Sequence, residues 1–189
     1  MVLSMFTHPA RTEPAPYSPE PWPEIGETWK PEGVTIVERY ANLAGAVVLV
    51  YSADRDGYHH VIACLGCHHL VSRNKDRTYN TRYTLEDAAK VANDHASTCR
   101  ALPRDIPTRP DDDVARKLLH QWVLSVPRRV EPLTLYLSDF DEERLTLQRT
   151  NGWIEKELQG FAAERPDLLS AKPSEYSSSI EFTLLGKPS

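Results

Sequence analysis

Two pairs of potential metal ligands constrain this chain more than any other feature of its sequence. Cys64 and Cys67 are two residues apart, and His95 and Cys99 follow with three residues between them, so all three cysteines belong to one pattern. Thiolate and imidazole are ligands that Zn²⁺ prefers, and four protein ligands leave no position open for a substrate water. Gly66 would allow the tight turn that points both thiolates at one ion. The pattern therefore predicts a structural zinc site and not a catalytic one.

The second ligand pair is expected on a helix. Thr84 has the form of an N-cap, the acidic Asp87 follows three residues later, and Pro103 would end the helix. Apolar residues and ligands recur here at steps of three and four, which places both ligands on the apolar side of the helix. The recurring residues are Leu85, Ala88, Ala92, His95 and Cys99.

Two other interpretations use only the first cysteine pair. Residues 64–68 also fit the pattern of c-type haem attachment, and Cys-x-x-Cys alone occurs as a redox pair. Neither interpretation accounts for His95 and Cys99, so a zinc site is favoured. His68 and His69 lie beside the pair and are second-choice ligands, to be used only if a ligand of the second pair fails to bind.

The four ligands resemble those of a Cys-Cys-His-Cys zinc finger of the ββα type. The interval between the two pairs is 27 residues, longer than the twelve or so of a DNA-reading C2H2 finger, which implies an enlarged second strand and loop. The pattern is also similar to small zinc-finger proteins of unknown role carried by bacterial mobile elements, over about residues 58–104. The resemblance implies a structural Zn²⁺ ion and indicates no particular activity.

The residues that lead to the first cysteine pair are typical of β-strands. Segments 35–40, 44–51 and 58–64 are rich in β-branched residues, and the last is preceded by turn residues, which predicts an antiparallel meander that ends at the cysteines. Segments 68–73 and 79–83 are expected to form a further hairpin with its tip at residues 74–76. With the helices, these strands predict an α+β fold built on an antiparallel sheet.

The last third of the chain predicts further helices and strands. The aspartates at 111–113 would cap a helix that stops before Pro127. Alternating apolar residues predict half-buried strands at 133–137 and 180–184. This region would be a second small α+β portion.

The residues between these two strands are harder to interpret. Leu145 and Leu147 alternate, which favours a strand at 144–149 that pairs with 133–137 across an acidic turn at 139–143. The carboxylates of that turn could bind a divalent cation, but they do not match a calcium loop, so a solvated turn is favoured. Asn151-Gly152 is typical of a turn and would precede a helix at 153–164.

Composition shifts along the chain predict three segments. Residues 1–33 hold seven of the fifteen prolines and would form an extended arm. Residues 34–104 would form the zinc-binding sheet and helix, and residues 105–189 the second α+β portion. The arm is either a leader without regular structure or a segment whose aromatic residues dock on a protein partner or on the chain's own core. Those aromatic residues are Tyr17, Trp22 and Trp29.

The charge distribution gives two hypotheses of function. The net charge is −5, but residues 34–110 carry ten basic and eight acidic side chains. The predicted hairpin contributes Arg73, Lys75, Arg77 and Arg82, which would contact the phosphates of DNA or RNA. The first hypothesis is therefore a nucleic-acid-associated accessory or regulatory protein. The alternative is a protein-interaction adaptor or inhibitor, because the overall negative charge and the acidic last third repel nucleic acid.

No motif supports an enzyme or a membrane protein. The sequence has no nucleophile elbow, phosphate-binding glycine loop or dinucleotide fingerprint. Residues 1–11 lack the basic segment and apolar core of a signal peptide, and the longest apolar run, 44–51, is only long enough for a strand. Thiolates held for a metal fit a reducing compartment. A cytoplasmic, metal-binding protein is expected.

Overall fold

The computed structural model describes residues 25–53, 57–73, 81–174 and 180–186. Within them the chain forms helices and two antiparallel sheets, which confirms the predicted α+β class. The first sheet has the strand order β1-β2-β3-β4. Its strands are β1 Thr35–Ala41, β2 Val47–Ser52, β3 Val61–Cys64 and β4 Leu70–Val71.

The predicted hairpin after the cysteines is described only at its base. β4 is short, and isolated antiparallel bridges then join Arg73 to Arg82 and His60 to Tyr83. The predicted tip lies in the range 74–80, outside the described residues.

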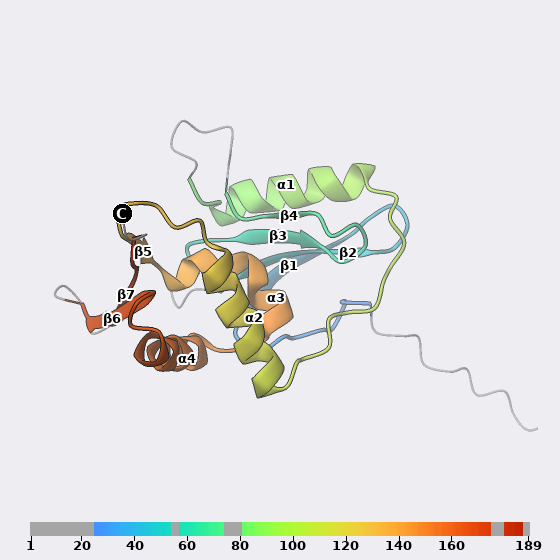
Figure 1. The fold of residues 1–189 in the computed structure, drawn as a ribbon. Coiled ribbons are helices and arrows are strands. Elements are labelled where there is room, and N and C mark those ends of the chain that lie inside the picture. The colour runs from blue at the N-terminus through green and yellow to red at the C-terminus, as the bar shows by residue number, and fades with distance from the viewer. Residues whose placement is uncertain (1–24, 54–56, 74–80, 175–179, 187–189) are drawn as a thin grey trace, which may run out of the picture.

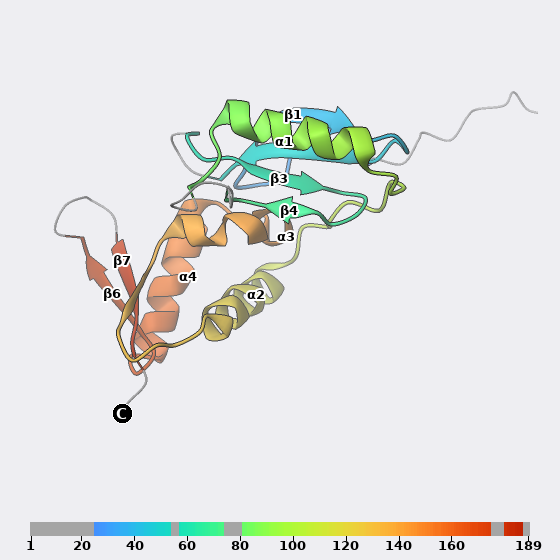
Figure 2. The ribbon, with the colours of Figure 1, turned by 90° about the horizontal axis from the view of Figure 1, so that it is seen from above.

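Helix α1, Leu85–Thr98, covers one face of the first sheet (Figures 1 and 2). Its buried residues are Ala88, Ala92 and Ala96, whose small side chains let the helix pack closely on the strands. Thr84 caps the helix as predicted, because its Oγ1 accepts a hydrogen bond from the amide of Asp87 at 3.2 Å. The sheet residues beneath the helix are Val48, Val50, Ile62 and Cys64.

The opposite face of the sheet is also covered. The end of the proline-rich arm lies there, with Ile25 and Trp29 packed against the core. Arg39 holds the arm in place, because its guanidinium donates to the carbonyl oxygens of Gly26 at 3.2 Å and Trp29 at 2.8 Å. Trp29 thus docks on the chain's own core, whereas Tyr17 and Trp22 lie outside the described residues. With both faces covered, β2 and β3 are continuously buried strands.

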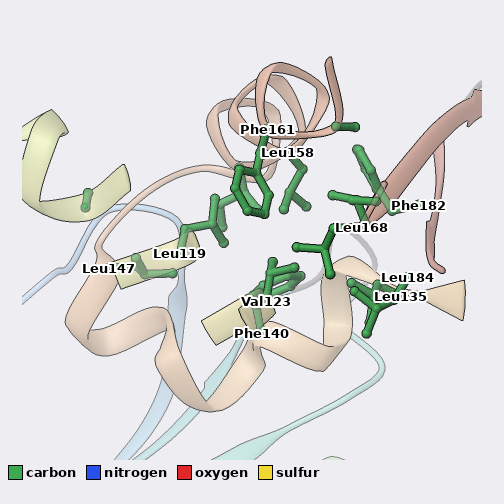
Figure 3. Close-up of a cluster of buried hydrophobic side chains, with 14 residues drawn as sticks. Leu119, Val123, Leu135, Phe140, Leu147, Leu158, Phe161, Leu168, Phe182 and Leu184 are labelled. Carbon is green, nitrogen blue, oxygen red and sulfur yellow. The ribbon is translucent and has the colours of Figure 1, made fainter. Parts of the chain in front are cut away.

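The second half of the chain has its own core. Helix α2 spans Asp112–Ser125, and the remaining elements surround the buried side chains shown in Figure 3. The second sheet has the order β5-β7-β6. The elements are β5 Leu133–Leu135, the 3₁₀ helix η1 Leu137–Glu143, α3 Arg144–Leu147, α4 Asn151–Glu164, β6 Leu169–Pro173 and β7 Ile180–Leu184.

The predicted strand at 144–149 is wrong, because this segment begins with the helix α3. Two residues apart means about 200° apart on a helix, at about 100° per residue. Leu145 therefore points into the core under the first sheet, and Leu147 points into the core of the second half. Apolar residues at every second position are typical of a strand with one buried face. Here they belong to a short helix that packs against two cores.

Two further predictions in this region need correction. Asn151 and Gly152 are not a turn but the first residues of α4, which is capped by Thr150 Oγ1. The strand β6 is absent from the prediction and lies beside β7, which therefore pairs with β5 on one side and β6 on the other.

No helix in the described part of the chain is both long and apolar enough to cross a membrane.

Candidate metal centre

The predicted ligands meet at one point between the first sheet and α1. One donor atom from each of Cys64, Cys67, His95 and Cys99 lies within 4.8 Å of the others. Cys67 Sγ lies 3.3 Å from His95 Nε2. Ligands of a tetrahedral Zn²⁺ ion, with bonds of about 2.0–2.3 Å, stand about 3.5–3.8 Å apart. The four residues are thus close enough to bind one metal ion.

The first two ligands lie on the turn that joins β3 to β4. The amide of Cys64 donates to the carbonyl of His69 at 2.8 Å, and the amide of His68 donates back to the carbonyl of Cys64 at 3.0 Å. His68 takes the left-handed backbone conformation, with φ of 60°. The turn itself spans residues 65–67, as predicted, but its left-handed residue is His68 and not Gly66.

Gly66 is needed for a different reason, namely the close approach of three segments. A β-carbon at this position would stand 2.7 Å from Ala46 Cβ, 3.0 Å from the carbonyl oxygen of Leu102 and 3.1 Å from Ala101 Cβ. The cysteine turn thus packs directly against the residues that follow α1. Because those residues come directly after Cys99, the contact sets the distance between the two halves of the ligand set.

The other two ligands lie at the end of α1. His95 is in its last turn, and Cys99 is its C-cap, whose amide donates to the carbonyl of His95 at 2.9 Å. The spacing of four residues places both side chains on the same side of the helix end. Cys99 lies just beyond the helix, and the predicted end at Pro103 is several residues too late.

Asn42 supports the centre, and sequence reasoning missed it. Its Nδ2 donates to Cys99 Sγ at 3.3 Å and to the carbonyl of Ala101 at 2.8 Å, and its Oδ1 accepts from the amides of Ala44 and Ala46. The side chain is buried and crosses 57 residues of sequence to reach Cys99. The sequence signals only a turn here, because nothing local connects Asn42 with a cysteine.

The surroundings of the ligands change their protonation. Burial raises the pKa of the Cys64 thiol to about 11. The backbone of Ala101 and the side chain of Asn42 hydrogen-bond to Cys99 and lower the pKa of its thiol. Burial and the neighbouring His69 lower the pKa of His95, which favours the neutral imidazole that binds metals. A bound cation would displace the thiol protons, so metal binding and proton release are linked.

The second-choice ligands lie outside the donor group. The ring of His69 stacks on that of His95, with centroids 4.3 Å apart and planes at 8°, so it fixes the orientation of a ligand. His68 Nε2 instead lies 2.7 Å from a guanidinium nitrogen of Arg104 and accepts a hydrogen bond from it. Among the described residues, no other group of three or more such side chains could hold a metal ion.

The acidic turn is only partly solvated, because Glu142 is exposed whereas Asp141 is buried. It forms η1, and its carboxylates face the base of the hairpin: Arg73 pairs with Asp139 at 3.3 Å, and Arg82 pairs with Asp141 at 2.9 Å. Asp141 is buried, and Glu142 accepts a hydrogen bond from Ser72 at 2.6 Å. Two of the four proposed nucleic-acid contacts are thus paired within the chain. The other two, Lys75 and Arg77, lie outside the described residues.

Comparisons with protein-family models, with curated proteins and with solved structures found no match to this chain. Its function therefore rests on the geometry described above.

Proposed function

We propose that the centre holds one structural Zn²⁺ ion and that the protein is a protein-interaction adaptor stabilised by this ion. Three thiolates and an imidazole suit Zn²⁺, and the complete set of protein ligands leaves no position for a substrate. The ion would join the β3–β4 turn to the end of α1. Interpretations that use only Cys64 and Cys67, as a haem attachment or a redox pair, leave the convergence of His95 and Cys99 unexplained.

The pairing of Arg73 and Arg82 with η1 is the observation that favours an adaptor over a nucleic-acid-binding protein. Both guanidinium groups face carboxylates of their own chain. Phosphate contacts depend on basic side chains that are free to release counterions from the nucleic acid. To bind a phosphate, each arginine would first have to exchange its carboxylate partner.

The exposed surface of α1 does not favour DNA either. Fingers that read DNA insert the N-terminal part of their helix into the major groove. Here that part carries Glu86 and Asp87. Carboxylates at this position would repel the phosphate backbone.

Exposed apolar residues that follow one another in sequence are the candidate contact for a protein partner. Four large apolar residues are exposed between the end of α2 and the start of η1, and Val130 is 83% exposed. Clusters of exposed apolar side chains commonly mark protein interaction sites. The four residues are Leu124, Val130, Leu133 and Tyr136, and we call them the apolar end patch.

Nucleic acid remains the second candidate partner, because the Arg73 side chain keeps 43% of its surface exposed beside the hairpin tip. If Arg73, Lys75 and Arg77 contact phosphates, replacing them with alanine should flatten the logarithmic salt dependence of binding by roughly two to three units. Absence of binding to duplex DNA or RNA at about 50 mM salt would exclude this candidate.

The adaptor proposal is tested by affinity purification from the native host, with and without nuclease. We expect a protein partner that survives nuclease and is lost with Val130→Asp in the apolar end patch. Leu102→Asp is the matched control, because it introduces the same charge at an exposed apolar residue outside the apolar end patch. Leu102 is 72% exposed and lies next to the metal centre. A partner that is lost on nuclease treatment, or that both variants retain, would contradict the proposal.

The zinc proposal has its own test. Purified protein should contain about one zinc ion per chain, and chelation should unfold the first sheet and α1, because metal binding and folding are coupled. Cys99→Ser should expose Cys64 and Cys67 to thiol reagents. Metal-free protein with the same fold and stability would refute the zinc proposal without affecting the adaptor test.

A further inference from the structure

The three cysteines of the metal centre differ in how easily a solute can reach them. The β3–β4 turn and the end of α1 lie side by side in Figures 1 and 2. Cys67, on that turn, is exposed, whereas Cys64 at the end of β3 is only 2% exposed and Cys99 is intermediate. The reactivity of a cysteine depends on such access. Cys67 is therefore the cysteine that a reagent in solution meets first.

The hydrogen bonds at the three sulfurs favour the same residue. Asn42 Nδ2 donates to Cys99 Sγ at 3.3 Å, and two backbone amides of the turn hydrogen-bond to the Cys64 thiol. Within the described residues, the only nitrogen that contacts Cys67 Sγ belongs to a fellow ligand, His95 Nε2 at 3.3 Å. Hydrogen bonds stabilise a thiolate and make it a weaker nucleophile. The sulfurs of Cys64 and Cys99 are thus shielded, and that of Cys67 is not.

We propose that Cys67 is a site of oxidation by hydrogen peroxide, and that its oxidation ends in a Cys64–Cys67 disulfide that dismantles the metal centre. The inference rests on the proposed metal ion, because metal ligation keeps these cysteines as thiolates. Redox-sensitive cysteines are commonly accessible thiolates beside a second cysteine. Cys67 and Cys64 have this arrangement.

The reaction has two steps. The Cys67 thiolate attacks one oxygen of the peroxide, the O–O bond breaks, hydroxide leaves, and Cys67 becomes a sulfenic acid. The Cys64 thiolate then attacks that sulfur, the S–S bond forms, the S–O bond breaks, and a second hydroxide leaves. One peroxide is thus reduced to two hydroxide ions while two thiolates are oxidised to one disulfide.

The geometry of the turn selects Cys64 as the partner. The amide of His68 donates to the carbonyl of Cys64 at 3.0 Å and closes the turn that contains Cys67. Residues three apart in a turn have α-carbons within about 7 Å of each other, close to the 4.4–6.8 Å or so that a disulfide requires. The donor atoms of the centre already lie within 4.8 Å of one another. Cys99 is the poorer partner, because Asn42 holds its sulfur.

The disulfide would remove half of the ligand set. His95 and Cys99 remain, both at the end of α1, and two ligands do not enclose a tetrahedral ion. The β3–β4 turn then loses its metal link to α1. Oxidised protein should therefore show the same loss of structure as chelated protein.

The test treats zinc-loaded, full-length protein with hydrogen peroxide. Dimedone traps the sulfenic acid, and mass spectrometry of the peptides locates it; we expect at least about tenfold more label on Cys67 than on Cys99. Without dimedone we expect a Cys64–Cys67 disulfide and release of about one zinc ion per disulfide to a chromophoric chelator, both reversed by dithiothreitol and added zinc.

A variant tests the shielding of Cys99. Asn42→Asp keeps the oxygen that accepts from the amides of Ala44 and Ala46 but removes the donor to Cys99, so the share of label on Cys99 should rise at least about threefold. Asn93→Asp is the matched control, because it adds the same charge at an exposed position of α1, and it should be labelled as the unmodified protein is.

The outcomes separate this inference from the zinc proposal. Zinc content is measured before peroxide is added, and metal-free protein at that stage would refute both. Zinc-loaded protein would refute this inference alone if the label appears first on Cys64 or Cys99, if the disulfide includes Cys99, or if zinc stays bound after the disulfide has formed. These results come from the unmodified protein, so they decide the matter even if Asn42→Asp does not fold.

Discussion

Gly66→Ala is expected to disturb the metal centre although it changes no ligand. The new β-carbon would stand 2.7 Å from Ala46 Cβ and 3.0 Å from the carbonyl oxygen of Leu102. Both atoms belong to the backbone or to a side chain too short to rotate away, so the cysteine turn must move from the residues after Cys99. Overpacking of this kind costs about 1–3 kcal/mol.

The cost should appear both in stability and in metal affinity. Because folding and metal binding are coupled in such sites, and every 1.4 kcal/mol or so is tenfold, we expect zinc affinity to fall by about 5- to 150-fold. Competition with a chromophoric chelator measures the affinity, and urea unfolding of the zinc-loaded protein measures the stability.

Gly152→Ala is the matched control for this experiment. A β-carbon at Gly152 meets no atom within 4 Å, and the residue lies in the first turn of α4. This variant should keep its zinc affinity and gain up to about 1 kcal/mol of stability, because alanine loses less conformational freedom in a helix. If Gly66→Ala binds zinc as tightly as Gly152→Ala, the argument from close approach at Gly66 is refuted.

Three other perturbations have defined outcomes. Arg82→Ala should lower the free energy of unfolding by about 3 kcal/mol, because it removes the ion pair that offsets the burial of Asp141. Urea unfolding of Arg82→Ala, Asp141→Asn and the double variant measures the coupling energy between the two residues. Thr84→Ala should cost about 1 kcal/mol through loss of the bond to the Asp87 amide, as measured by thermal unfolding. Burial raises the pKa of Glu143 above its ordinary 4.5, so the folded state binds this proton more tightly than the unfolded chain. Its contribution to stability is thus present below about pH 4.5 and lost as the pH rises through the folded value. Glu143→Gln should remove this loss and be more stable than the unmodified protein at pH 7, which urea unfolding across this pH range will test.

Local patterns predicted much of the first sheet and the metal centre. The ligand spacing determines that Cys64 and Cys67 share a turn and that His95 and Cys99 share a helix end, because both relations span only a few residues. The N-cap at Thr84 and the β-branched runs of the first sheet are equally local. These features depend on neighbours in sequence, so the sequence alone contains them.

The supporting parts of the centre were beyond prediction. Asn42 reaches Cys99 across 57 residues, and Gly66 is required by contacts with residues on two other segments. A sequence pattern records which residue types are present and not which surfaces meet. The prediction therefore placed the turn correctly at Gly66 but missed the contacts that require a glycine there and the left-handed conformation of His68.

The sequence by itself determined the candidate ligand set, the helix that carries half of it and the α+β class. The tertiary structure decided how the two halves meet. The alternation of Leu145 and Leu147 predicts a strand. In the structure these residues lie on opposite sides of a short helix, and each side packs into a different core. The basic residues of the hairpin predict a surface for phosphates. In the structure Arg73 pairs with a carboxylate of η1 that is 66 residues away along the chain, and Arg82 with one that is 59 residues away. Burial and charge pairing depend on distances in space, and only the folded chain brings segments so far apart in sequence within a few ångströms of each other.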